Sequence, residues 1–277
     1  MPAFWRLSFF GGLLLALAGC GPASGTALPP LTRVVATAPV TPFPTAAPPT
    51  AAPADTGWSV VTPGLERRGL VQPLPDWPLG EPLVIFRIDP AAFTLRVLYT
   101  PGFPSFVSAW DHEARLVVNG GFFDENNAAL GLLVSDGRAY GQSYDGFGGM
   151  LAVNSLGMLS LRSLADEPFQ PGEALAQAVQ SFPVLVRPDG TDFDQEDEQR
   201  ARRTVIGQDA AGRLVVVVAP QGGFTLAGLA AWLRGSDLGL ALALNLDGGG
   251  STGYYAGGED QIDSLTPVPA VIAFYEK

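Results

Sequence analysis

Short apolar runs separated by turn residues fill most of the chain after residue 80 and limit the folds it can adopt. They predict strands at 83–88, 95–99, 116–118, 131–134, 150–153, 158–161, 184–186, 205–208, 214–218, 240–246 and 268–274. Most end at Gly, Pro, Asn or Asp, which is typical of strands joined by turns. Helical patterns occur only at 172–180 and 226–234, and Thr225 can cap the second. Few helices among many strands argue against a doubly wound parallel sheet and favour a single α+β domain.

A change in composition near residue 57 separates this domain from what precedes it. Residues 21–56 are dominated by Pro, Ala and Thr, and their only charged side chains are Arg33 and Asp55. Such a segment cannot bury enough apolar surface to offset the entropy lost on ordering. We therefore expect an extended tether over 20–56 and a folded domain over 57–277.

The first 19 residues have the pattern of a signal peptide. Arg6 precedes a short apolar run at 9–17, and Ala18 and Gly19 lead to Cys20, the only cysteine of the chain. The sequence around Cys20 resembles the bacterial lipobox, in which the cysteine is acylated after cleavage. We therefore predict a lipoprotein of the bacterial cell envelope, outside the cytoplasm and anchored through Cys20. The alternative is an ordinary signal peptide in which the cysteine is a coincidence.

Charge and cysteine content exclude several classes of partner. The chain has 16 Lys and Arg against 27 Asp and Glu, a net charge of −11. This balance argues against binding to nucleic acid or to an anionic membrane surface, and leaves the lipid anchor as the only expected membrane contact. One cysteine permits neither an intramolecular disulfide framework nor a cysteine-cluster metal site. Any anionic ligand must therefore be captured by a few placed groups.

The first cluster of candidate functional residues follows the predicted strand at 116–118. Asn119 offers both a hydrogen-bond donor and an acceptor, and Gly120 and Gly121 allow a tight turn and close approach of the backbone. Taken alone, an Asn-Gly-Gly turn is more often part of a hairpin or bulge.

The second cluster, Arg203 and Thr204, leads into the predicted strand at 205–208 and follows an acidic run at 192–198. The run is not an EF-hand, because Asp197 stands where the loop needs glycine and Arg203 where it needs glutamate. A half-buried Arg203 would pair with a carboxylate or a phosphate. An internal salt bridge is the alternative.

The third cluster is the most specific. The apolar run at 240–246 ends in Asn245 and Asp247, which lie on one side of an extended chain, and four small residues follow: Gly248, Gly249, Gly250 and Ser251. Backbone amides in such a turn can approach a ligand oxygen and bind an anion. The spacing fits neither a P-loop nor a dinucleotide-binding motif. A plain glycine-rich turn capped by Ser251 is the alternative.

Together, the three clusters resemble the phosphodiester glycosidase family. The family's Asn-x-Gly-Phe-Phe motif is matched at 119–123, its Arg-Thr-x-Ile-Gly motif at 203–207 and its Asn-Leu-Asp-Gly-Gly-Gly-Ser motif at 245–251. The resemblance spans about 83–275, nearly the whole expected domain. It implies hydrolysis of the bond between a sugar's anomeric carbon and a phosphodiester, which releases free sugar and a phosphomonoester.

The resemblance also suggests roles for individual residues. We expect Asp247 to act as nucleophile or general base, and Arg203 with the amides of the glycine turn to stabilise the phosphate leaving group. The expected substrate-binding residues are Asn119, Gly120, Gly121, Thr204, Asn245, Gly248, Gly249, Gly250 and Ser251. Asp124 and Asp145 are candidates for a second carboxylate, although each is more often a turn residue.

Two other functions stay open at this point. A non-catalytic envelope lipoprotein that binds a glycan or phosphoglycan could keep the same pocket, and a phosphodiesterase could cut on the alcohol side of the phosphate. The sequence requires no cofactor. A calcium ion held by Asp124, Asp247 and the acidic run is possible, but no spacing demands one.

Overall fold

The computed structural model describes residues 54–191, 193, 195 and 198–277, which belong to one compact unit, Ala51–Lys277. The predicted signal peptide, Cys20 and most of the predicted tether lie outside the described residues, as do Asp192, Asp194, Glu196 and Asp197 of the acidic run. The predictions that fall on these residues therefore stay predictions.

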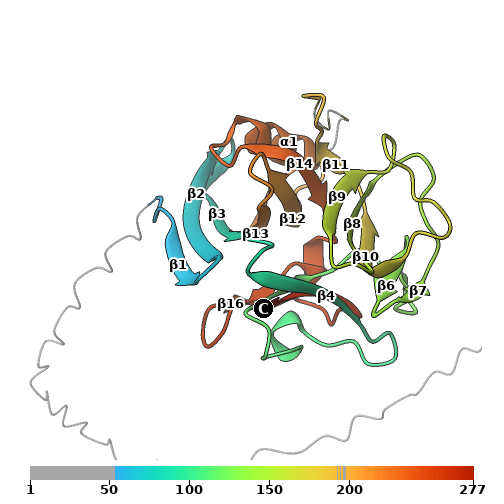
Figure 1. Cartoon of the computed structure of the whole chain (residues 1–277). Coiled ribbons are helices and arrows are strands. Elements are labelled where there is room, and N and C mark those ends of the chain that lie inside the picture. Colours follow the sequence, from blue (N-terminus) through green and yellow to red (C-terminus); the bar gives the residue numbers. More distant parts are fainter. Residues whose placement is uncertain (1–53, 192, 194, 196–197) are drawn as a thin grey trace, which may run out of the picture. The chain divides into compact units, whose positions relative to one another are not determined.

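The largest of three sheets has seven strands, each antiparallel to its neighbours. In spatial order they are β1 (Ser59–Thr62), β2 (Leu65–Leu74), β3 (Trp77–Ile88), β13 (Leu214–Phe224), β12 (Ala201–Asp209), β14 (Leu240–Asn245) and β11 (Val184–Val186). In Figure 1, β2 and β3 curve along one side of this sheet.

Two five-stranded antiparallel sheets complete the architecture (Figure 1). The first is ordered β7 (Arg138–Tyr140), β6 (Leu133–Ser135), β10 (Leu175–Ser181), β8 (Gly149–Asn154) and β9 (Leu159–Ser163). The second is ordered β16 (Gln261–Ile262), β15 (Tyr254–Tyr255), β5 (Leu116–Asn119), β17 (Ala270–Glu276) and β4 (Phe93–Tyr99). Two short 3₁₀ turns, η1 (Val107–Ala109) and η2 (Gly249–Ser251), lie in the connections.

The main core lies where the three sheets pack together. Alternate side chains of β12 and β14 enter it, including Ile206 and Leu244, and meet Leu151 of one small sheet and Val118 of the other. The opposite face of the large sheet packs against α1 (Leu226–Gly235), whose Leu229, Ala230 and Leu233 are buried. As predicted, the Thr225 hydroxyl caps this helix by accepting a 3.0 Å hydrogen bond from the Gly228 amide.

Among the described residues, the structure confirms a strand-rich fold in which all three sheets are antiparallel. These residues contain only one α-helix, so the α+β prediction is confirmed in part. Each strand predicted from the apolar runs coincides with or overlaps an observed strand. The helix predicted at 172–180 is wrong, because β10 occupies most of that range. Ala178 and Val179 of β10 pair with both β6 and β8, so tertiary pairing overrides the local helical pattern.

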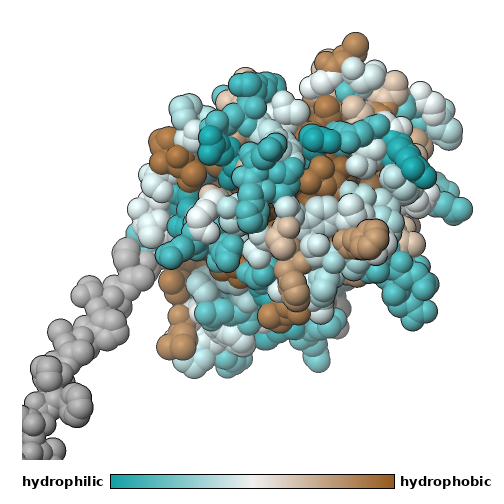
Figure 2. Space-filling model, turned by 90° about the horizontal axis from the view of Figure 1, so that it is seen from below, coloured by the Kyte–Doolittle hydropathy of each residue, from teal (hydrophilic) through white to brown (hydrophobic). Residues whose placement is uncertain are grey.

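The surface of this unit is mostly polar on the face seen in Figure 2, where hydrophobic residues form several separate groups. None of the described helices has the length and apolar content needed to cross a membrane.

Candidate active site

The three sequence clusters meet where β5 and β14 end and β12 begins, and Asn119 joins them. The fully buried Asn119 side chain donates a 2.7 Å hydrogen bond from Nδ2 to the Asp247 carbonyl. Its Oδ1 accepts from the Thr204 hydroxyl at 2.7 Å and from the Gly253 amide at 3.2 Å. The Asp247 amide in turn donates to the Gly120 carbonyl at 3.2 Å. One amide side chain thus ties together residues from two sheets.

Strand register brings Arg203, Asn245 and Asp247 to one face of the large sheet. Val205 of β12 is paired with Asn245 of β14, and the Leu246 amide donates to the Thr204 carbonyl at 2.8 Å just beyond that pair. Continuing the register by two residues places Asp247 across from Arg203. Thr204 points to the other face, where it meets Asn119.

The glycines of two motifs are required by close approach of the backbone. A Cβ added to Gly248 would lie 2.8 Å from the Arg202 carbonyl oxygen and 3.8 Å from Cδ of Arg203, so the Arg203 side chain passes beside this glycine. A Cβ on Gly121 would lie 2.8 Å from the carbonyl oxygen of Gln180 in β10, and one on Gly120 would lie 3.1 Å from that of Ala270 in β17. Gly249 has a φ of +57°, which favours glycine.

Asp247 is partly exposed at the edge of this glycine turn. Burial raises the pKa of its carboxyl group, and hydrogen bonds from the Ser251 side chain and the Gly248 amide partly offset that rise. The Gly248 amide lies 2.9 Å from Oδ1 of Asp247. Partial desolvation of a reachable carboxylate is typical of a catalytic acid or base.

Two arginines flank the turn. Arg203 is 9% exposed, and its Nη2 donates to the Gln199 carbonyl at 2.8 Å. Arg202 donates from Nη2 to the Asp263 carbonyl at 3.0 Å, and burial lowers the pKa of its guanidinium. An anion at Gly248 would therefore lie beside a largely buried cation.

Neither candidate for a second carboxylate is held beside Asp247 by a described contact. Oδ1 of Asp124 accepts hydrogen bonds from the amides of Asn126 at 2.8 Å and Ala128 at 2.9 Å, which makes Asp124 a turn residue. Asp145 is exposed in the loop between β7 and β8. Among the described residues, no group of three or more His, Cys, Asp or Glu side chains could hold a metal ion.

Sequence reasoning missed Gly253, which completes the Asn119 network. The Asn119 amide donates to the Gly253 carbonyl at 3.3 Å, and a Cβ on Gly253 would lie 2.7 Å from the Ser264 amide nitrogen. The Ser-Thr-Gly sequence at 251–253 contains this glycine, but its partner is 134 residues away along the chain. A contact between residues so far apart in the sequence is formed only by the tertiary structure.

Comparison with known proteins decides the family. Residues 112–275, more than half of the chain, match the phosphodiester glycosidase family. The chain belongs to the phosphodiester glycosidase family. The match includes all three motifs and the strands that carry them.

Solved structures share the fold at low sequence identity. The catalytic domain of zebrafish N-acetylglucosamine-1-phosphodiester α-N-acetylglucosaminidase, auto-inhibited by its pro-peptide, is 20% identical with a TM-score of 0.63, over 79% of this chain and 86% of that one. A hypothetical protein from Synechocystis is 16% identical with a TM-score of 0.53, over 78% and 63%. A Burkholderia pseudomallei protein named as a predicted exported protein is 15% identical with a TM-score of 0.53, over 71% and 74%. No curated protein gives a significant match.

Proposed function

We propose that this member of the family hydrolyses a sugar-1-phosphodiester at the bond between the anomeric carbon and the phosphate oxygen. The observation that carries the proposal is the strand register that places Asp247 across from Arg203, whose side chain passes beside Gly248. A carboxylate and a guanidinium on one sheet face suit the two charges of this reaction. The anomeric centre becomes positive, and the leaving phosphate needs its negative charge stabilised.

Each group has a defined part in the proposed reaction. Asp247 attacks the anomeric carbon or removes a proton from the water that does so, the bond from that carbon to the phosphate oxygen breaks, and its electron pair leaves with the phosphomonoester. If Asp247 attacks directly, water then hydrolyses the ester between Asp247 and the sugar, which releases the free sugar and restores the carboxylate. Arg203 stabilises this leaving group, together with the amides of Gly249 and Gly250, because the first amides of a helical turn have no acceptor within it. Ser251 holds the Asp247 carboxylate through its hydrogen bond.

Asn119 and Thr204 have a different role in this proposal. Both are fully buried and hydrogen-bonded to each other, so they are suited to positioning the backbone of Asp247. We propose that they support the site without touching the substrate. Gly120 and Gly121 allow the same close packing. Of the predicted substrate-binding residues, we therefore propose that Asn245 and the glycine turn contact the ligand.

We further propose that the enzyme works in the bacterial cell envelope, anchored by acyl chains on Cys20. The lipobox-like sequence supports this placement, and the Burkholderia protein of similar fold is itself named as exported. Radiolabelled palmitate supplied to cells that make the full chain should be incorporated into wild type. The Cys20→Ala variant should incorporate none.

Turnover of sugar-1-phosphodiesters by the purified full chain, followed through the free sugar that is released, tests the catalytic proposal. Wild type should release free sugar, and Asp247→Asn should lose at least about 10³-fold in kcat, the magnitude of removing a catalytic carboxylate. Asp76→Asn is the matched control, because Asp76 is an exposed turn residue and should leave kcat unchanged.

The products separate the proposal from its alternatives. Mass spectrometry should find free sugar and a phosphomonoester. Release of sugar phosphate instead would identify a phosphodiesterase that cuts on the alcohol side. Saturable binding without any product across several sugars would identify a glycan-binding lipoprotein, and full activity in Asp247→Asn would remove Asp247 from its proposed role.

A further inference from the structure

Three aromatic side chains gather around a fourth, Phe182, beside the candidate active site. The Phe182 ring lies 4.6 Å from that of Phe122, 5.6 Å from that of Tyr144 and 5.9 Å from that of Phe147, between centroids. Tyr144 and Phe147 also stack on each other at 4.8 Å. We call these four residues the aromatic cluster. They come from three separate loops, so only the tertiary structure assembles them.

The aromatic cluster is open to solvent. Phe182 is 38% exposed and Phe147 is 51% exposed, while Phe122 and Tyr144 are half-buried. Burying these rings in a core would be favourable, so leaving several of them grouped at the surface has a cost. Grouped exposed aromatic residues of this kind mark binding sites, whereas scattered ones do not.

Direct contacts join the aromatic cluster to the catalytic strands. Nδ2 of Asn245 donates to the Phe182 carbonyl at 2.9 Å, and the Asn245 amide donates to the Pro183 carbonyl at 3.0 Å. Asn245 is the last residue of β14 and lies two residues before Asp247, so a continued extended chain puts both side chains on the same side. Phe122 directly follows Gly121 of the first motif. The cluster therefore adjoins the face that carries Asp247 and Arg203.

An unsatisfied acceptor belongs to Asn245, whose side chain contacts the backbone of Phe182 in the aromatic cluster. Asn245 is only 2% exposed, and its Oδ1 has no hydrogen-bond partner although its Nδ2 is bonded to the backbone of Phe182. Buried amide oxygens are nearly always paired, so this atom is an acceptor that a ligand donor would satisfy. A hydrocarbon chain cannot supply one, but a hydroxyl group can.

The loop that carries two of the rings is held in place before any ligand binds. Oε1 of buried Gln180 accepts from the Tyr144 amide at 2.8 Å, and its Nε2 donates to the Ser143 hydroxyl at 2.7 Å. The Tyr144 hydroxyl donates to the Leu130 carbonyl at 2.8 Å. Such preorganisation lowers the entropy lost when a ligand binds.

We propose that the aromatic cluster and Asn245 form the sugar subsite of this enzyme, in which the apolar face of a pyranose ring packs on Phe182 and a ring hydroxyl donates to Oδ1 of Asn245. A neutral sugar combines an apolar face with hydroxyl donors, which is the combination that these groups require. The placement of the anomeric carbon toward Asp247 rests on the function proposed above, whereas the binding of the sugar does not.

Titration of the purified full chain with free monosaccharides, followed by saturation-transfer NMR, tests this subsite without any turnover. Wild type should show transfer from protein aromatic protons to at least one of N-acetylglucosamine, glucose, mannose and galactose. Phe182→Leu keeps the apolar volume but removes the ring, and should weaken binding about tenfold, the order expected for one aromatic contact. Phe182→Tyr should retain affinity. Phe103→Ala, a change at a phenylalanine that is 85% exposed in the turn after β4, should match wild type.

The two proposals fail in different ways. Sugar binding that depends on Phe182, in a protein that turns over no sugar-1-phosphodiester, would keep the subsite and overturn the catalytic function. Turnover in wild type with equal KM in Phe182→Leu and Phe103→Ala, and with no sugar binding, would overturn the subsite and keep the function. Saturable binding of an alkyl phosphate, with no binding of any sugar, would also overturn the proposed sugar subsite.

Discussion

Asn119 is the residue that connects the largest number of site elements. All of its hydrogen-bonding capacity is used by Thr204, Gly253, Asp247 and Gly120, although the 3.4 Å contact to the Gly120 carbonyl is long. Replacing a buried residue with this many partners lowers the free energy of unfolding substantially, because each partner is left without a hydrogen bond. Its position explains why the first motif needs asparagine and not merely a polar turn residue.

Asn119→Ala should therefore destabilise the protein and displace Asp247. Losing bonds to a buried hydroxyl and a buried amide should lower the free energy of unfolding by about 2–5 kcal/mol. Urea denaturation measures this change. Asn126→Ala, at an exposed turn residue, is the control and should change stability little. An unchanged unfolding midpoint in Asn119→Ala would contradict the role assigned to this side chain.

The raised pKa of Asp247 has opposite consequences for activity and stability. If Asp247 works as a carboxylate, activity should fall on acidification through a pKa above its ordinary value of 3.8. A carboxyl group whose pKa is raised by folding destabilises the folded state once it is ionised, at pH values above that ordinary pKa. Asp247→Asn should consequently raise the melting temperature at pH 7, or leave it unchanged, while abolishing activity. Calorimetry and a pH–rate profile measure the two effects, and a lower melting temperature in the variant would contradict this account.

At the scale of elements, glycines let backbones approach closely, between two sheets at Gly121 and within the large sheet at Gly248. Gly121 after β5 lies against β10, and Gly248 after β14 lies against β12. No side chain fits at either contact without moving a backbone carbonyl. The glycine content of the motifs is therefore a packing requirement, apart from any role of the amides in binding an anion.

Gly121→Ala should cost about 1–3 kcal/mol of stability, because its Cβ would overlap the Gln180 carbonyl and overpacking of this kind is destabilising. Gly102→Ala is the matched control, since a Cβ there has nothing within 4 Å and the backbone does not require glycine. Thermal melts of both variants should separate them by several degrees. Equal melting temperatures would show that β10 can move away from Gly121.

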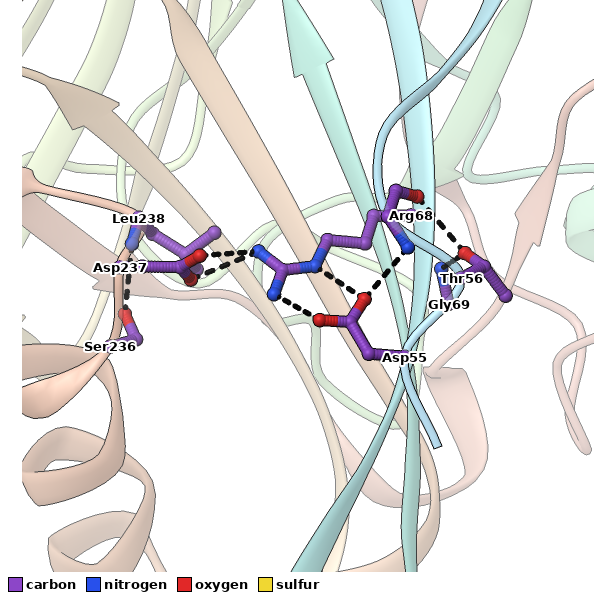
Figure 3. Close-up of polar contacts among 8 residues, drawn as sticks. Asp55, Thr56, Arg68, Gly69, Ser236, Asp237 and Leu238 are labelled. Carbon is purple, nitrogen blue, oxygen red and sulfur yellow. Dashed lines mark hydrogen bonds and ion pairs between the residues drawn. The ribbon is translucent and has the colours of Figure 1, made fainter. Parts of the chain in front are cut away.

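At the scale of the whole unit, one buried arginine fastens the beginning of the described chain to the end of α1 (Figure 3). Nη2 of Arg68 in β2 lies 2.6 Å from Oδ2 of Asp55, and Nη1 lies 2.8 Å from Oδ2 of Asp237. The hydrogen bonds from Arg68 and from the Gly57 amide lower the pKa of Asp55 to about 2. The two ion pairs of Arg68 connect segments that are far apart in sequence, beside the edge strand β1.

Arg68→Leu should release the residues before β2. We expect a lower melting temperature and earlier proteolytic cleavage near 54–62, because two carboxylates lose their shared partner. Arg138→Leu, at an exposed arginine of β7, should behave as wild type. Since the pKa of Asp55 is lowered by folding, its contribution to stability should be present above pH 4 and lost as the pH falls toward 2. Cleavage at the same rate in both variants would show that the Arg68 ion pairs do not hold the residues before β2 in place.

The local pattern determined much of this protein. Nearly continuous apolar runs such as 214–218 and 240–246 became core strands, and Thr225 capped the α-helix found among the described residues. Glycines and polar residues in three motifs were enough to indicate the family that the comparison confirms.

What tertiary structure decided depends on contacts across long separations in the chain. Residues 175–181 became a strand because two neighbouring strands pair with it, and Asn119 became a buried connector because Gly253 and Thr204 reach it. Loops distant in sequence gathered the aromatic cluster around Phe182. Propensity and periodicity record only neighbours along the chain, so none of these contacts could be predicted from them.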